Sequence, residues 1–234
     1  MTSSDDGVRN HLIEILPGPA RQRLLALCEP AELTLAAVLG EAGRPMPAIY
    51  FPLEGFVSLL AEVDGHPGLG VGLVGREGML GEQLALGVLR SPLRAVVQGA
   101  GRAWRIAAPA FRRELAASLP LRLCVDRYLY VRMVQLARSA ACLRFHLLAP
   151  RLARLLLSCQ DRAQADRFHM THESLARMLG VRRVGVTLAA NAIQRLGLIS
   201  YRRGEVCVLL RRELTAIACS CYGVECRHYA ELLG

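Results

Sequence analysis

The stretch from Met170 to Leu209 constrains the fold of this chain more than any other, because it predicts two short helices joined by a tight turn. Thr171 is a favourable N-cap, and Glu173 places a carboxylate in the first turn, where the helix dipole favours it. Gly180 supplies the positive φ that a sharp turn after a helix requires. The first helix has one apolar face, formed at helical spacing by Leu175, Met178 and Leu179.

A second helical pattern follows, and its first turn begins with Arg182 and Arg183. The residues predicted to face inward are Val186, Ala189, Ala190, Ile193 and Leu196. Small side chains on this helix allow the close approach that a helix-turn-helix requires. Strand-like runs at 198–201 and 205–209 then flank Arg202-Arg203-Gly204 and predict a hairpin. Two helices, a turn and a hairpin together predict a winged helix.

Charge indicates what this unit binds. Between Arg177 and Arg212 the chain carries eight arginines and one acid, a net charge of +7. Cations at this density neutralise phosphates and release counterions from a duplex, which supplies most sequence-independent affinity. The stretch therefore predicts binding to double-stranded DNA. The alternative is an arginine-rich solvated face of an ordinary three-helix unit.

Length, charge and composition limit the class of protein to which this chain can belong. The chain has 234 residues and a net charge of +9, of which residues 1–149 carry +3 and residues 150–234 carry +6. No window reaches the roughly 18 uninterrupted apolar residues of a membrane helix, and residues 1–12 contain no signal-peptide core, so we expect a cytoplasmic protein without membrane contact. In such a protein the eight cysteines are expected to be reduced and mostly buried.

The rest of the chain predicts an α+β fold. Two short helices broken at Pro17-Gly18-Pro19 precede a region, about residues 32–106, of short apolar runs separated by Gly and Pro, which predicts an antiparallel β-roll. A long helical pattern follows over about 110–148, and Pro150 is expected to begin the next helix. We divide the chain into an N-terminal roll domain (1–108), a long dimerisation helix (109–149) and a winged helix with a tail (150–234).

A 3.5-residue repeat runs along the long helix and predicts a homodimer. Its residues are Leu129, Met133, Leu136, Ala140, Leu143 and Leu147. The alternative is that this face packs on the β-roll of its own chain.

The order of the predicted elements and several motifs resemble those of the Crp/Fnr transcription regulators of bacteria. The motifs are Tyr-Phe-Pro-Leu at 50–53, Gly-Arg-Glu-Gly-Met at 75–79, Leu-Ala-Arg-Met-Leu-Gly-Val-Arg-Arg at 175–183 and Ala-Cys-Ser-Cys-Tyr at 218–222. The resemblance implies a cyclic-nucleotide-binding-like β-roll, a dimerisation helix and a winged helix-turn-helix that binds a two-fold-symmetric operator. It also implies RNA polymerase as a partner if the protein is an activator.

The resemblance also implies the roles of individual residues. Arg183 matches a family arginine that reads guanine, whereas two further base-reading positions are occupied here by Val184 and Leu188, so a different operator is expected. We therefore assign base reading to Arg182, Arg183 and Thr187. Phosphate contacts are assigned to Thr171, His172, Arg202 and Arg203.

For the roll, the resemblance implies a place where a cyclic nucleotide could bind. Gly81-Glu82 and Arg90-Ser91 stand in roughly the order of the family's ribose and phosphate contacts, although the loop between them is shorter than in the cyclic-AMP receptor. An arginine with backbone N–H groups can hold a phosphate. The alternative is a roll that binds no effector.

Metal and enzyme sites are less well supported by the sequence than the DNA-binding unit is. Cys219, Cys221 and Cys226 with His228 have metal-like density, but their spacing does not match a zinc finger, so we expect structural thiols and no metal. His146 is isolated in the sequence and is not expected to be a ligand.

No P-loop, nucleophile elbow or His-Glu-x-x-His motif is present, and we expect no enzymatic activity. A winged helix used for protein contact, or for metal or redox sensing, is the remaining alternative.

Overall fold

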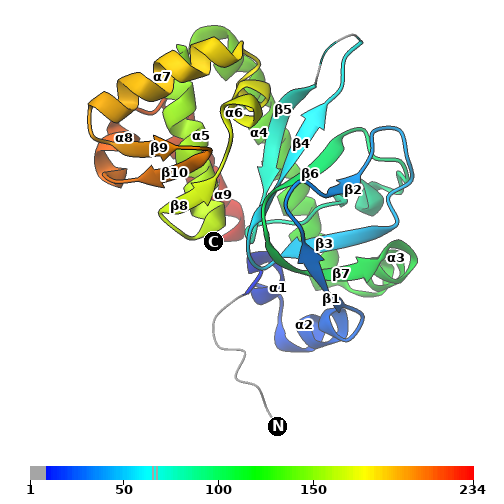
Figure 1. The fold of residues 1–234 in the computed structure, drawn as a ribbon. Coiled ribbons are helices and arrows are strands. Elements are labelled where there is room, and N and C mark those ends of the chain that lie inside the picture. Colours follow the sequence, from blue (N-terminus) through cyan, green and yellow to red (C-terminus); the bar gives the residue numbers. More distant parts are fainter. Residues whose placement is uncertain (1–8, 65, 67) are drawn as a thin grey trace.

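The structure is a computed structural model that describes residues 9–64, 66 and 68–234. Residues 1–8, which include most of the segment expected to lack a signal-peptide core, lie outside the described residues. Figure 1 shows a β-rich half and a mainly helical half side by side, with the C-terminal helix at their junction. None of the helices in the described part of the chain combines the length and hydropathy needed to cross a bilayer.

Two short helices, α1 (His11–Glu14) and α2 (Gly18–Leu25), begin the described chain and are separated at Pro17, as predicted. Asn10 caps α1 by accepting from the Ile13 amide. Its side-chain amide also donates to Pro52 O and Gly78 O at 3.0 and 2.8 Å. This buried side chain therefore fixes the start of α1 on the β-rich half.

The β-rich half is an antiparallel roll of two sheets, which confirms the predicted fold class. One sheet has the order β1-β7-β3 and the other β2-β6-β4-β5. The strands are β1 (Glu29–Leu33), β2 (Val38–Gly40), β3 (Ala48–Pro52), β4 (Phe56–Ala61), β5 (Leu69–Val74), β6 (Arg94–Gly99) and β7 (Gly101–Ala107), with a short 3-10 helix η1 (Glu82–Leu86) between β5 and β6. The apolar runs in the sequence predict β3 to β6. Strand β1, with the sequence EPAEL, and the three-residue β2 lack such a run.

Three helices connect the roll to the second half: α3 (Ala108–Ala117), α4 (Leu119–Phe145) and α5 (Leu148–Ala163). The single long helix expected from about 110 breaks at Ser118, whose hydroxyl caps α4 by accepting from the Leu121 amide at 3.4 Å. The helix expected to begin at Pro150 begins two residues earlier, at Leu148. Pro is tolerated there because the N–H groups of the first helical turn have no intrahelical acceptor.

The second half contains the winged helix and a helical tail. Its elements are β8 (Arg167–His169), α6 (His172–Leu179), α7 (Arg183–Arg195), β9 (Ile199–Arg202), β10 (Glu205–Val208), α8 (Arg211–Ile217) and α9 (Cys221–Leu233). Strand β8 pairs with β10 and makes the predicted hairpin a three-stranded sheet of order β8-β10-β9. Strand β8 was not predicted from the sequence.

Each half has its own apolar core. The first contains Phe51, Ile106, Phe111 and Tyr128, and the second contains Leu152, Leu156, Leu175 and Val186. The tip of the roll takes part in the second core through Leu60 and Leu73 of β4 and β5. The α9 helix returns along α4 and places Leu233 in the first core. The two halves therefore pack against each other directly in one chain.

Candidate nucleic-acid interface

The α6-turn-α7 unit has the geometry that its sequence predicts. Thr171 Oγ1 accepts from the Ser174 amide at 3.1 Å and caps α6. Gly180 has φ +63° and ends α6 in the left-handed conformation. Arg182 is the N-cap of α7, and Arg183 is its first helical residue.

One face of α7 is buried in the second core. Val186, Ala189, Ala190 and Ile193 are buried as predicted. The prediction for Leu196 is wrong, because this side chain is 64 % exposed. The helix ends at Arg195, and Gly197 with φ +73° turns the chain away, so the helical spacing no longer applies at Leu196.

The opposite face of α7 is exposed and carries side chains suited to base edges. Val184 and Leu188 are 69 % and 65 % exposed although both are apolar. Apolar side chains on a recognition helix contact thymine methyl groups, and an asparagine can bind adenine through two hydrogen bonds. Asn191 is exposed close to this pair. Asn191 was not predicted as a contact residue, although its position three residues after Leu188 places it on the same helix face.

The wing lies beside this helix. Arg203 and Gly204 form the two-residue turn between β9 and β10, with φ +52° and +85°. Positive φ at both positions is typical of the turn whose twist matches the flanking strands. Arg202 and Arg203 are both exposed there.

A hollow of about 350 Å³ lies between the helices and the wing. Its lining includes four of the predicted DNA-contacting residues, which the fold therefore brings together, and adds Tyr201: the residues are Thr171, His172, Arg183, Tyr201, Arg203 and Gly204. Tyr201 was missed because its pattern is that of an ordinary strand residue. The hollow places Arg203 of the wing, an assigned phosphate contact, beside Arg183, an assigned base reader.

His172 is held tightly beside this hollow. Its Nδ1 shares a hydrogen bond with Thr187 Oγ1 at 3.0 Å, and its ring meets the edge of the Tyr201 ring at a centroid distance of 4.4 Å. The Thr187 hydroxyl also donates to Arg183 O at 3.1 Å. His172 Nδ1 and the Thr187 hydroxyl therefore both have hydrogen-bond partners within the protein.

Burial and charge shift the pKa values around the hollow. Burial lowers the pKa of His172 below its ordinary value of 6.5, and the positive charge of Arg183 lowers it further. Burial raises the pKa of Tyr201 to about 12, and Arg183 opposes that rise. The imidazole is therefore held towards its neutral form by a neighbouring cation.

Not all of the predicted cations lie at this hollow. Arg182 lines a separate hollow between α6 and the roll, with Val63 and Leu69 of the β4–β5 hairpin region. Arg211 donates to Asp161 at 2.6 Å and to the Tyr222 hydroxyl at 2.7 Å. It therefore ties the tail to α5, and its charge is partly neutralised within the chain.

The residues assigned to an effector are each engaged within the chain. Glu82 Oε1 lies 3.5 Å from Nε of the buried Arg132 on α4. Arg90 donates to Gly43 O at 2.8 Å, and the Ser91 hydroxyl donates to Leu93 O at 2.6 Å. Gly81 has φ +97° and precedes η1. Glu82 therefore links the roll to the long helix.

The predicted dimer seam is partly exposed in the single chain. Met133 is 66 % exposed and Leu136 41 %, and Ala140 is exposed as well. Leu129 packs against the first core, and Leu143 is half-buried. Further exposed apolar residues of α4 that the repeat did not include are Leu119, Leu123, Tyr130 and Phe145. Exposed apolar side chains are therefore concentrated on α4 among the described residues.

Two of the three cysteines that lie close together in the sequence near the C-terminus belong to a group with residues from another part of the chain. Cys219 and Cys221 lie with Cys142 and His146, and the ligand atoms of these four residues are all within 4.8 Å of one another. Cys226 is exposed and is not part of the group. Cys142 and His146 could not be predicted from spacing, because they lie at the end of α4, far along the chain from Cys219 and Cys221.

Comparison with known proteins agrees with this geometry. A family model described as the Crp-like helix-turn-helix domain matches residues 150–217. The chain has the Crp/Fnr regulator fold. This Crp/Fnr-type architecture, with its cyclic-nucleotide-binding-like roll and its helix-turn-helix, confirms the resemblance seen in the sequence.

Several solved structures share the fold over most of their length. TTHA1359, a CRP/FNR-family transcriptional regulator from Thermus thermophilus, is 25% identical with a TM-score of 0.64, and the match covers 82% of this chain and 99% of that one. FixK2 from Bradyrhizobium japonicum is 12% identical with a TM-score of 0.70, covering 82% and 98%. The c-di-GMP-responsive regulator CLP from Xanthomonas campestris is 20% identical with a TM-score of 0.66, covering 82% and 99%. No curated protein matches the chain significantly.

Proposed function

We propose that this chain is a sequence-specific DNA-binding transcription regulator that acts as a homodimer on a two-fold-symmetric operator. The observation that carries the proposal is the two-sided character of α7. Its inner face is fixed in the second core, while Val184, Leu188 and Asn191 are exposed and arginines lie at its start and on the wing. Such a helix fits the major groove, and the flanking cations fit the phosphates on either side.

Homodimer formation through α4 is part of the proposal. The exposed apolar residues of α4 would be covered by the same helix of a second copy. Two copies of α7 then face two half-sites. RNA polymerase is a further partner if the regulator is an activator.

An effector at the roll receives less support than DNA binding. The roll interior is filled by side chains such as Ile49, Phe51, Met79 and Ile106, and the assigned ligand residues are bonded within the chain. A cyclic nucleotide would have to displace the bond between Arg90 and Gly43. Binding of DNA, rather than catalysis, is the role that the described residues support.

The test measures binding of the purified chain to DNA from its own promoter region across a salt series. We expect affinity to fall linearly on a log–log plot, with a slope of several units, because several phosphate contacts release counterions. Affinity for a random duplex should be weaker by at least about 1,000-fold. Absence of binding at low salt would favour the alternative of a protein-binding winged helix.

The matched variants are Arg183→Ala and Arg227→Ala, since both arginines are exposed but Arg227 lies on α9. Arg183→Ala should lose about 1–3 kcal/mol of binding free energy and relax one base position. Arg227→Ala should bind as the wild type does. An Arg183→Ala variant that keeps wild-type affinity and specificity would show that this arginine does not read the operator.

A further inference from the structure

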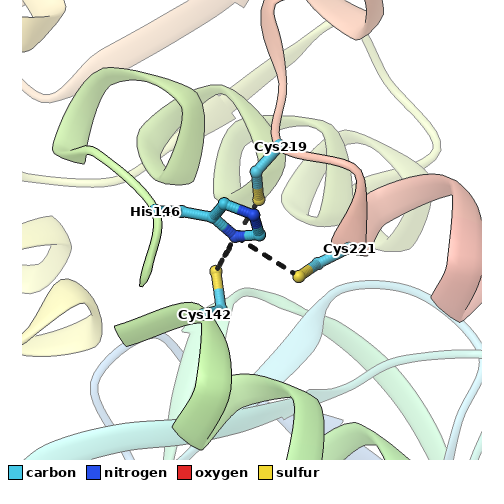
Figure 2. A group of neighbouring side chains, drawn as sticks. All are labelled: Cys142, His146, Cys219 and Cys221. Carbon is cyan, nitrogen blue, oxygen red and sulfur yellow. Dashed lines mark hydrogen bonds between the residues drawn. The ribbon is translucent and has the colours of Figure 1, made fainter. Parts of the chain in front are cut away.

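Three thiols and one imidazole converge at the end of α4. Cys142 lies in the last turn of α4, and His146 is the residue that ends the helix four positions later. Cys219 and Cys221 come from the junction of α8 and α9, 77 residues from Cys142 in the case of Cys219. Figure 2 shows the three sulfur atoms gathered around the imidazole ring of His146.

Three of the six distances between these atoms match the edges of a tetrahedron around one metal ion, and the others are at most 4.8 Å. Cys142 Sγ lies 3.7 Å from Cys219 Sγ, and His146 Nδ1 lies 3.5 Å from Cys142 Sγ and 3.6 Å from Cys221 Sγ. Zinc bonds of about 2.3 Å to sulfur and about 2.0–2.1 Å to nitrogen give tetrahedral edges of about 3.8 Å between sulfurs and about 3.6 Å between sulfur and nitrogen. The side chains are thus already arranged at the spacing that a bound ion would impose.

The size of the group distinguishes between kinds of metal centre. All four ligand atoms lie within 4.8 Å of one another, which leaves room for one ion at their centre. An iron–sulfur cluster has several metal and sulfide atoms between its cysteines and needs a wider cage. Three thiolates with one imidazole is an established donor set for structural zinc.

Ordinary packing of small apolar side chains explains this group less well. Cys142, Cys219 and Cys221 are buried but form a cluster of their own, apart from the two large cores. An imidazole nitrogen that faces two sulfurs contributes little to apolar packing. No pair among these cysteines forms a disulfide, since all are free.

The charges around the group suit an anionic metal complex. Zn²⁺ with three thiolates and a neutral imidazole carries a net charge of −1. The Arg154 guanidinium lies near the three thiols. Arg151 is also buried close to Cys142 and Cys219 and has no carboxylate partner among the described residues. Arg154 is already paired with Glu225 at 2.6 Å, so Arg151 is the cation that would balance the charge of the complex.

We propose that Cys142, His146, Cys219 and Cys221 bind one Zn²⁺ ion per chain in a closed tetrahedral site. On binding, the three thiols release their protons to solvent and the imidazole coordinates through Nδ1. With four protein ligands the site leaves no open position for a substrate or water, so its role is structural.

The position of the site specifies what the ion would hold. His146 and Leu147 form the connection between α4 and α5, and the Cys219 amide donates to Pro150 O at 3.1 Å. The ion would therefore join the end of the long helix to the tail, next to the two-residue connection that leads into α5. Loss of zinc should loosen this contact between α4 and the tail.

The first test measures metal in the full-length chain purified under reducing conditions. We expect one zinc per chain by elemental mass spectrometry, and X-ray absorption should show three sulfurs and one nitrogen at about 2.3 and about 2.0 Å. Cobalt(II) in place of zinc should give thiolate-to-metal charge-transfer bands and the intense visible bands of a tetrahedral site. These measurements use the wild-type chain and so do not depend on the folding of a variant.

The second test uses Cys221→Ser and Cys142→Ser, with Cys226→Ser as the matched control. Cys226 lies on the same helix as Cys221 but outside the group. Each ligand variant should weaken zinc affinity by about 100-fold or more, whereas Cys226→Ser should bind as the wild type does. A wild-type chain that binds no zinc when reduced, a Cys142–Cys219 disulfide in its place, or zinc binding that needs Cys226 would each overturn the proposal.

Discussion

His172 illustrates how single residues at this surface are adjusted by their neighbours. The ring is fixed between Thr187 and Tyr201, and its Nε2 is buried without a hydrogen-bond partner. Burial and Arg183 keep its pKa below the ordinary value. A nearby phosphate would act in the opposite direction, because a negative charge stabilises the protonated imidazole.

This contrast predicts a pH dependence of DNA binding. If DNA raises the pKa of His172, binding takes up a proton, and affinity should increase as pH falls through the pKa of the complex towards the lower pKa of the free protein. The increase should be at most about tenfold per pH unit for one proton. Fluorescence anisotropy between about pH 5.5 and 7.5 measures it.

His172→Gln is the control, because it keeps a side chain that can hydrogen-bond but cannot be protonated. This variant should lose the pH dependence attributed to His172. Equal pH profiles for the variant and the wild type would show that DNA binding does not change the pKa of His172.

At the scale of elements, the turn between α6 and α7 depends on Gly180 for two reasons. Its φ of +63° favours glycine, and a Cβ there would lie 2.7 Å from Leu69 Cδ1 of the roll. Gly197, after α7, has φ +73°, but a Cβ at this position would have no other heavy atom within 4 Å. A comparison of alanine substitutions at the two positions therefore separates the cost of backbone strain from the cost of crowding.

We expect Gly197→Ala to lower the free energy of unfolding by about 1–2 kcal/mol through backbone strain alone. Gly180→Ala should cost about 0.5–1 kcal/mol more, because the half-buried Leu69 side chain must adopt another conformation. Urea denaturation of both variants measures the difference. Equal losses would show that the roll yields to the new methyl group without cost.

The apolar stripe of α4 leads to a prediction about assembly. Met133→Asp should place a charge at the centre of the proposed dimer contact and raise the dimer dissociation constant by about 100-fold, since each buried carboxylate would face its own copy. Ala116→Asp, on the exposed surface of α3, is the control. Analytical ultracentrifugation measures both, and a dimeric Met133→Asp variant would place the dimer contact elsewhere.

On the scale of the whole molecule, the tail connects parts that are distant in sequence. Tyr222 packs in the second core and Leu233 in the first. The Tyr229 hydroxyl donates to Glu77 O, and His11 Nε2 lies 2.7 Å from Leu233 O. The proposed zinc site anchors the start of α9, so it should influence the stability of the whole chain.

We therefore expect chelation of zinc to lower the melting temperature by on the order of 10 °C, because a ligand present at about 1,000 times its dissociation constant contributes about 4 kcal/mol. Differential scanning calorimetry with and without a chelator measures this shift. Cys221→Ser should respond less to the chelator than the wild type does, because its zinc affinity is weaker. Magnesium should not restore the loss, because it prefers oxygen ligands.

The sequence by itself determined the elements whose causes are local. The cap at Thr171, the positive φ at Gly180 and the Arg203-Gly204 turn depend on neighbours within a few residues, so their patterns predicted them. The apolar runs of β3 to β6 and the inner face of α7 were predicted for the same reason. The resemblance to the Crp/Fnr regulators added the expected arrangement of these elements.

Only the tertiary structure decided which distant residues meet. Strand β8 is short and forms because β10 offers a free edge, and Tyr201 joins His172 because the wing folds back on α6. The Cys142–His146 pair meets Cys219 and Cys221 only when α9 returns along α4. Contacts of this kind depend on the packing of whole helices, and the spacing of residues along one segment contains no record of them.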